Sequence, residues 1–87
     1  MENITGSKYG DTLIGDNQNN VLRGLSGDDI MIGGRGKDSL HGGTGRDRLY
    51  GDEGSDVLEG GGGADLLEGG TGAVSYTHLT LPTTVSV

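Results

Sequence analysis

Aspartate recurs at a fixed interval along this chain, and its carboxylate is a side chain that binds hard metal ions. The acids begin at Asp11 and follow a nine-residue period, in which position 20 carries Asn20 in place of an acid. Each has a glycine five residues before it and an apolar residue two residues after it. The acids of this series are Asp11, Asp29, Asp38, Asp47, Asp56 and Asp65. A fixed period of this length predicts one small unit that stacks on itself.

The six residues that run from each of these glycines to its aspartate have the composition of a tight turn. The clearest copies are residues 33–41, Gly-Gly-Arg-Gly-Lys-Asp-Ser-Leu-His, and residues 42–50, Gly-Gly-Thr-Gly-Arg-Asp-Arg-Leu-Tyr. Glycine adopts positive φ without steric cost, so such a turn can direct several backbone carbonyl groups toward one point. Ca²⁺ takes about six to eight oxygen ligands and accepts carboxylates together with carbonyls. Two facing turns that supply about three oxygens each would complete this shell, so the pattern predicts calcium binding.

The apolar residues form a second column on the same period. They are Leu13, Leu22, Met31, Leu40, Leu49, Leu58 and Leu67. Because the apolar spacing of three or four residues that marks a helix is absent, we expect very short strands with the middle side chain inward. If each coil holds two repeats, turns two repeats apart stack about 4.8 Å apart on the same side. One side would then carry Asp11, Asp29, Asp47 and Asp65, and the other Asn20, Asp38 and Asp56.

The tandem Gly-Gly-x-Gly-x-Asp turns of residues 6–73 resemble the RTX repeats, the hemolysin-type calcium-binding nonapeptides of bacterial exported proteins. The resemblance implies an all-β fold, a right-handed parallel β-roll (a two-sheet β-solenoid) with Ca²⁺ between adjacent turns. Carried over position by position, the metal-binding acids fall on Asp29, Asp38, Asp47, Asp56 and Asp65. The turn glycines fall on Gly24, Gly27, Gly33, Gly34, Gly36, Gly42, Gly43, Gly45, Gly51, Gly54, Gly60, Gly61 and Gly63. Other residues replace the second and third glycines of the first two turns, so Asp11 and Asn20 are weaker candidate ligands.

Composition bears on the partners and the compartment. The 87-residue chain has a formal net charge of −7, which argues against nucleic acid and anionic membranes as partners and favours cations. No apolar run approaches the ~20 residues that span a bilayer, so no membrane insertion is expected. Residues 1–5 lack the features of a secretory signal peptide, so we expect export by another route or a segment outside this chain. By the family resemblance, the protein is expected to be secreted.

Stability is expected to depend on the metal. Seven apolar side chains make a small core, and the chain has no cysteine that could form a disulfide. Stacked carboxylates would also repel one another until a cation binds between them. We therefore expect an acidic chain that is unfolded without Ca²⁺ and rolls up where Ca²⁺ is plentiful.

The last residues differ in composition from the repeat. Every Gly, Asp, Glu, Lys and Arg lies at or before Gly72, and the position where the period requires the next acid is Val74. The string Val-Ser-Tyr-Thr-His-Leu-Thr-Leu-Pro-Thr resembles a translated transposase adapter from sequencing libraries. We predict an RTX β-roll over residues 1–73 and a non-repeat tail over residues 74–87, which is foreign sequence or a disordered or strand-like end. With a foreign tail, further RTX repeats or a parent domain are expected beyond residue 73.

Other functions find less support in the sequence. A metal-free solenoid with solvated turns predicts mixed Asn, Ser and Asp at the sixth repeat position, whereas the observed column is almost entirely Asp. A phosphate loop lacks its Lys-Ser or Lys-Thr pair, and no twelve-residue EF-hand loop is present. His41 is expected to be an isolated outward strand residue, and no Ser, His and acid can be grouped, so no enzyme is predicted. Two alternatives stay open: a piece of an RTX protease, lipase, epimerase or toxin whose catalytic part is absent, and a structural adhesin or surface repeat.

Overall fold

The computed structural model describes residues 2–72, 74–77 and 84–86, and all regular secondary structure in them is β-strand. The strands are β1 (Glu2–Thr5), β2 (Thr12–Ile14), β3 (Asn20–Arg23), β4 (Ile30–Ile32), β5 (Ser39–His41), β6 (Arg48–Tyr50), β7 (Asp56–Glu59), β8 (Leu66–Glu68), β9 (Val74–Thr77) and β10 (Thr84–Ser86). Within these ranges, no helix is long and apolar enough to cross a membrane.

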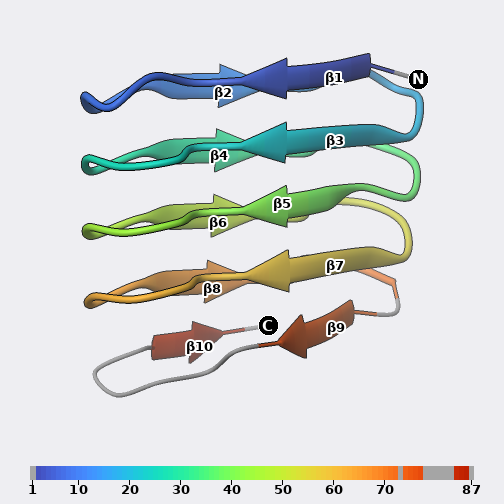
Figure 1. Ribbon diagram of the computed structural model, residues 1–87. Helices are drawn as coiled ribbons and strands as arrows, with labels where there is room; N and C mark the ends of the chain where they lie inside the picture. Colours follow the sequence, from blue (N-terminus) through green and yellow to red (C-terminus); the bar gives the residue numbers. More distant parts are fainter. Residues whose placement is uncertain (1, 73, 78–83, 87) are drawn as a thin grey trace.

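The strands form two parallel sheets that face each other (Figure 1). One sheet has the order β1-β3-β5-β7-β9, and the other has the order β10-β8-β6-β4-β2. Because consecutive strands alternate between the sheets, each coil contains two nonapeptides. In Figure 1 the chain runs leftward along the nearer odd-numbered strands, returns along the fainter even-numbered strands, and descends by one level per coil. This path is a right-handed coil, so the predicted right-handed β-roll is confirmed.

The pairing register between coils follows from the repeat length. Leu22 pairs with Leu40 in one sheet, and Leu49 pairs with Leu67 in the other, in each case across eighteen residues. Eighteen residues are two repeats, so every residue stacks on a residue of the same repeat position. The predicted stacking of turns two repeats apart is therefore confirmed.

The core is the single column of apolar side chains between the sheets. Strands β2, β4, β5, β6 and β8 have three residues each, and in every one only the middle side chain is buried. The seven buried apolar residues are Leu13, Leu22, Met31, Leu40, Leu49, Leu58 and Leu67, and Ile4 packs against them. Six of the seven are completely inaccessible to solvent, which confirms the inward-facing middle position.

Both sheets continue into the C-terminal segment. Strand β9 pairs with β7 so that Val74 lies in register with Asp56, and β10 pairs with β8. Residues 73, 78–83 and 87 lie outside the described residues. The boundary at residue 73 and the foreign origin of residues 74–87 stay predictions.

Candidate metal centre

The aspartates form two columns, one along each side of the roll. Within each column, the backbone N–H of a sixth-position residue donates to Oδ1 of the aspartate eighteen residues later, as far as Asp56 and Asp65. The donor–acceptor distances are 2.8 Å for Asp11 to Asp29, 3.0 Å for Asp29 to Asp47 and 2.9 Å for Asp47 to Asp65. On the other side they are 2.9 Å for Asn20 to Asp38 and 3.0 Å for Asp38 to Asp56. These are the two groups of residues that the period predicts.

The second carboxylate oxygen of each acid from Asp29 onward has a different environment. Oδ2 of Asp29, Asp38, Asp47, Asp56 and Asp65 is buried and has no hydrogen-bond partner among the described residues. Each of these residues is 3% exposed or less. A buried carboxylate oxygen without a partner is costly unless a cation or a proton neutralises it. The chain repeats this costly arrangement five times, which is what a row of cation sites requires.

Burial also changes the acidity of these groups. Loss of hydration raises the pKa of Asp47 to about 7 and the pKa of Asp56 to about 6. For both acids, the carboxylates stacked in the same column raise the pKa further, and a backbone hydrogen bond opposes the shift. The pKa values of Asp29, Asp38 and Asp65 are raised for the same leading reason, burial. Either a bound cation or a proton would therefore stabilise these carboxylates in the folded chain.

The turn glycines are required by backbone conformation and by close stacking. The second and fourth positions of the well-formed turns have positive φ, as at Gly43 (86°) and Gly45 (98°). A Cβ at either position would also collide with a carbonyl group of the stacked turn one coil earlier. The first glycine is needed for space, since a Cβ on Gly42 would lie 2.6 Å from Oδ2 of Asp47. The carbonyl groups and the aspartates of stacked turns are thereby brought into contact.

Two other residues adopt the glycine conformation at the second turn position. Leu25 has a φ of 73° and Asp52 a φ of 68°, in the left-handed region that side chains with a Cβ rarely occupy. The stacked turns hold both residues in this conformation. Gly70 and Gly72 also have positive φ, although our prediction ended the turn glycines at Gly63. The sequence Gly69-Gly70-Thr71-Gly72 repeats the pattern of the earlier turns, and this pattern indicates that the turn glycines extend to Gly72.

The hydrogen bonds of Asn20 identify the oxygens that surround this position of a turn. Its Nδ2 donates to the carbonyl oxygen of Gln18 at 2.8 Å and to Oδ1 of Asp38 at 3.0 Å. The carbonyl oxygens of Asp16 and Gly33 lie 3.4 Å from the same atom. Two carbonyls of its own turn, one of the next turn and a carboxylate thus converge there. A set of carbonyl and carboxylate oxygens fits Ca²⁺.

The first turn differs from the later ones. Both carboxylate oxygens of Asp11 have donors within the turn, since the backbone N–H of Ser7 lies 2.6 Å from Oδ2 and the Ser7 hydroxyl lies 3.2 Å from Oδ1. Ser7 and Tyr9, which stand where later turns have glycine, do not adopt positive φ. This turn has neither the backbone conformation nor the unpartnered oxygen of the later turns.

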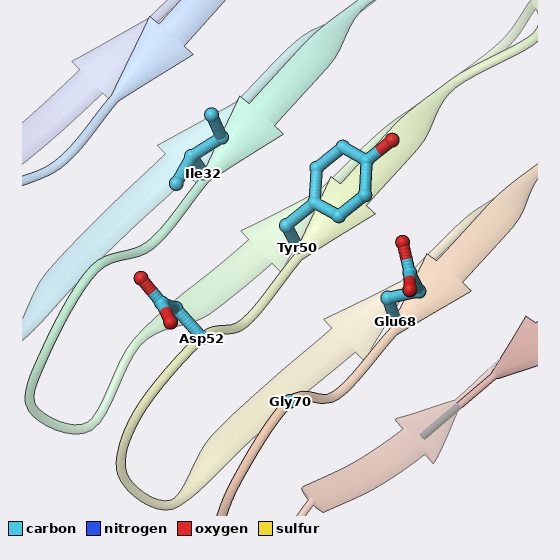
Figure 2. Close-up of a pocket in the computed structure, with 5 residues that line it drawn as sticks. All are labelled: Ile32, Tyr50, Asp52, Glu68 and Gly70. Carbon is cyan, nitrogen blue, oxygen red and sulfur yellow. The ribbon is translucent and has the colours of Figure 1, made fainter.

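Besides the aspartate columns, a contact of His41 with Glu59 and a hollow on one sheet lie in the described part of the chain. No group of three or more His, Cys, Asp or Glu side chains there is placed to hold a metal, so a site must use backbone carbonyls. His41 is not isolated as predicted, because its Nδ1 lies 3.2 Å from Oε2 of Glu59, its partner in the neighbouring strand of the sheet. A hollow of about 320 Å³ lies on the outer face of β4, β6 and β8, where Ile32, Tyr50 and Glu68 lie in register (Figure 2).

Comparison with known proteins gives one match. Residues 5–40 and 41–74 match the RTX calcium-binding nonapeptide repeat, described as 4 copies. No curated protein and no solved structure matches the chain. RTX nonapeptide repeats bind Ca²⁺ and are structural, not catalytic, and they occur in secreted bacterial proteins. With most of its length matched and the two-column geometry described above, the chain belongs to the RTX calcium-binding nonapeptide repeat family.

Proposed function

We propose that this chain is a calcium-dependent folding module of a secreted bacterial protein, in which Ca²⁺ bound between stacked turns provides the free energy that holds the roll together. The observation that carries the proposal is the unpartnered, buried Oδ2 in each turn from Asp29 onward. Inside a roll without metal, these oxygens face neighbouring oxygens in a poorly hydrated space, and repulsion opposes stacking. A divalent cation turns this repulsion into attraction.

The ligands that we assign come from pairs of turns with an acid in each. Three such pairs lie within the described turns: Asp29 with Asp47, Asp38 with Asp56, and Asp47 with Asp65. For the first pair, the carbonyl groups at the positions equivalent to those around Asn20 belong to Leu25, Gly27 and Gly42. The site between Asp11 and Asp29 and the site between Asn20 and Asp38 are weaker. Neither Asp11 nor Asn20 presents an unpartnered carboxylate oxygen.

Calcium supplies neutralising charge and a flexible oxygen-rich shell, and the chain supplies everything else. The glycines allow the carbonyl groups to approach, and the inward leucine column fixes the spacing of the coils. Because the separate turns have no preformed site in the unfolded chain, calcium binding free energy becomes folding free energy. Extracellular calcium near the millimolar range suits modules of this kind, whose dissociation constants are about 10⁻⁴–10⁻³ M.

Circular dichroism with a calcium titration tests the proposal on the full chain. We expect a disordered far-ultraviolet spectrum in chelator and a β spectrum at millimolar Ca²⁺. Magnesium should be much less effective, because it requires near-octahedral geometry and keeps its own waters. A β spectrum that chelator leaves unchanged would contradict the proposal, and so would a chain that calorimetry shows to bind no Ca²⁺.

We further propose that the module serves a larger parent protein, such as an RTX exoenzyme or toxin or a repetitive surface protein. Support comes from the family, whose repeats occur in secreted bacterial proteins, and from the structural role of the repeat itself. Coding sequence on both sides of residues 1–73 would test this, with a catalytic domain or further repeats as the two expected outcomes.

A further inference from the structure

Asn20 is the one member of the sixth-position series in the described turns that carries an amide. A Cβ on Gly15 would lie 2.6 Å from Nδ2 of Asn20, whereas a Cβ on Gly42 would lie 2.6 Å from Oδ2 of Asp47. Relative to the turn backbone, the amide nitrogen thus takes the position that the unpartnered carboxylate oxygen has in later turns. Asn20 replaces the oxygen that needs a cation with a group that carries partial positive charge.

The amide nitrogen satisfies the oxygens that converge on this position. It donates to the carbonyl oxygen of Gln18 and to Oδ1 of Asp38, with the carbonyl oxygens of Asp16 and Gly33 at longer range. The opposite amide orientation would place an acceptor against four acceptors, so the hydrogen bonds fix Nδ2 there. The donated bonds link the turn of residues 15–20 directly to the turn of residues 33–38. This link requires no metal.

The other column begins in a related way. At Asp11, the backbone N–H and the hydroxyl of Ser7 donate to the carboxylate, so protein donors occupy its oxygens. In both columns, therefore, hydrogen-bond donors of the chain satisfy the position that the unpartnered Oδ2 has in later turns, and these Oδ2 atoms start only at Asp29 and Asp38. The amide oxygen Oδ1 of Asn20 is itself buried and has no hydrogen-bond partner among the described residues. The first coil differs chemically from the coils that follow it.

We propose that the Asn20 amide is a built-in substitute for Ca²⁺ between the turns 15–20 and 33–38, which makes the N-terminal coil a metal-independent end of the roll. This inference rests on the proposed calcium function and deepens it. The chain then binds one Ca²⁺ fewer than an otherwise identical chain with aspartate at position 20. The link between these two turns then needs no bound ion, whereas the pairs of stacked aspartates need one.

Asn20→Asp tests the substitution directly. We expect one additional Ca²⁺ per chain at saturation, measured by calorimetry and by equilibrium dialysis with ⁴⁵Ca²⁺. We also expect a stronger requirement for calcium in the folding titration, since the new carboxylate repels that of Asp38. Asn17→Asp is the matched control, because it adds the same charge at an exposed position of the same turn and should leave the stoichiometry unchanged.

The reverse exchange tests the same idea where a cation is expected. Asp29→Asn should bind fewer ions and still reach the β spectrum at a calcium concentration no higher than the unaltered chain requires, because the amide can donate to the surrounding oxygens. Asp29→Ala, which removes ligand and donor alike, should need severalfold more calcium.

The outcomes separate the two proposals. If the unaltered chain binds Ca²⁺ but Asn20→Asp adds no ion, or if Asp29→Asn needs as much calcium as Asp29→Ala, the amide substitution is wrong and the calcium function stands. If the unaltered chain binds no Ca²⁺, the proposed function is overturned and the inference falls with it.

Discussion

The backbone N–H of Asp47 donates to Oδ1 of Asp65 at 2.9 Å, while Oδ1 of Asp47 itself accepts the N–H of Asp29 at 3.0 Å. Asp47 is thus an inner residue of its column, and the acids on both sides of it, Asp29 and Asp65, have an unpartnered Oδ2. Each hydrogen bond fixes one carboxylate oxygen and leaves Oδ2 free to bind a cation. The same bond that sets the register of the coils also orients the proposed ligand.

This place between two such acids predicts that Asp47 matters more than Asp11 for calcium binding. Asp47→Ala removes a ligand from the pair with Asp29 and from the pair with Asp65, so we expect the loss of about two Ca²⁺. Asp11→Ala should cost at most about one, since Ser7 already donates to that carboxylate. Calorimetric titration of both variants measures the stoichiometry. Equal losses would mean that the assignment of sites to pairs of stacked turns is wrong.

The stability of the metal-free roll should depend on pH. The pKa of Asp47 is raised to about 7 and that of Asp56 to about 6, against an ordinary value of 3.8. A raised carboxyl pKa means that the metal-free roll binds more protons than the unfolded chain between about pH 4 and about pH 7, so its stability falls as pH rises through this window. The fraction of chain that is folded without metal, measured by far-ultraviolet circular dichroism, should therefore be greater at about pH 5 than at about pH 8.

Calcium and protons compete for the same oxygens, so the metal shows the opposite trend. The Ca²⁺ affinity of a roll that is already folded should fall by about tenfold for each pH unit below the raised pKa values, for each proton displaced. Folding from the unfolded chain, whose aspartates have the ordinary pKa of 3.8, should require more Ca²⁺ only as the pH falls to about 4. Calorimetry in two buffers of different ionisation enthalpy should detect protons released on binding. Ca²⁺ binding to metal-free β structure at about pH 5 without release of protons would contradict the burial of these carboxylates.

The period of the sequence was enough to predict the pairing of Leu49 with Leu67 and the two aspartate columns. Two repeats per coil impose a register of eighteen residues, and the inward position of each leucine then follows from strand alternation. The contact of His41 with Glu59 lies on the same register, but on the outer face, where the period alone does not indicate which side chains interact.

Other features depend on tertiary contacts that a period does not contain. The orientation of the Asn20 amide follows from four oxygens that come from two turns, and the engagement of Asp11 by Ser7 depends on a local turn conformation. Likewise, the stacked neighbours force Leu25 into positive φ against its own preference. A sequence pattern shows that a position departs from the repeat, but the contacts show what replaces the lost interaction.

Glycine substitutions should separate the roles of different turn positions. At Gly45, φ is 98° and a Cβ would collide with the carbonyl oxygen of Gly27, so Gly45→Ala should destabilise the calcium-loaded roll by about 2 kcal/mol or more. Gly62 has no atom within 4 Å of a Cβ placed on it. Gly62→Ala should therefore be neutral or stabilising by about 0.4–1 kcal/mol. Thermal unfolding at saturating calcium compares them, and equal destabilisation would contradict the stacked-turn geometry.

Leu25 offers a test in the opposite direction. Its side chain is 49% exposed and its φ is 73°, so the turn bears conformational strain with little burial in return. Leu25→Gly should relieve this strain and raise the stability of the calcium-loaded roll by about 1 kcal/mol, whereas Leu25→Val should lower it. Thermal unfolding of the two variants gives the comparison. A glycine variant less stable than the valine variant would show that the leucine side chain contributes through packing.

The C-terminal end allows a new site to be built. The turn that begins at Gly69 already has positive φ at Gly70 (77°) and Gly72 (96°), and Val74 lies in register with Asp56. Val74→Asp should therefore place a carboxylate one coil beyond Asp56 in its column and add about one Ca²⁺ per chain, measured by calorimetry. Ser75→Asp is the matched control, because it adds the same charge in register with the partly exposed Val57 and should add no ion. Equal stoichiometry for both variants would show that a carboxylate at the sixth position is insufficient at this end, and that the pair Asp47 and Asp65 depends on more of the repeat than its glycines and its acid.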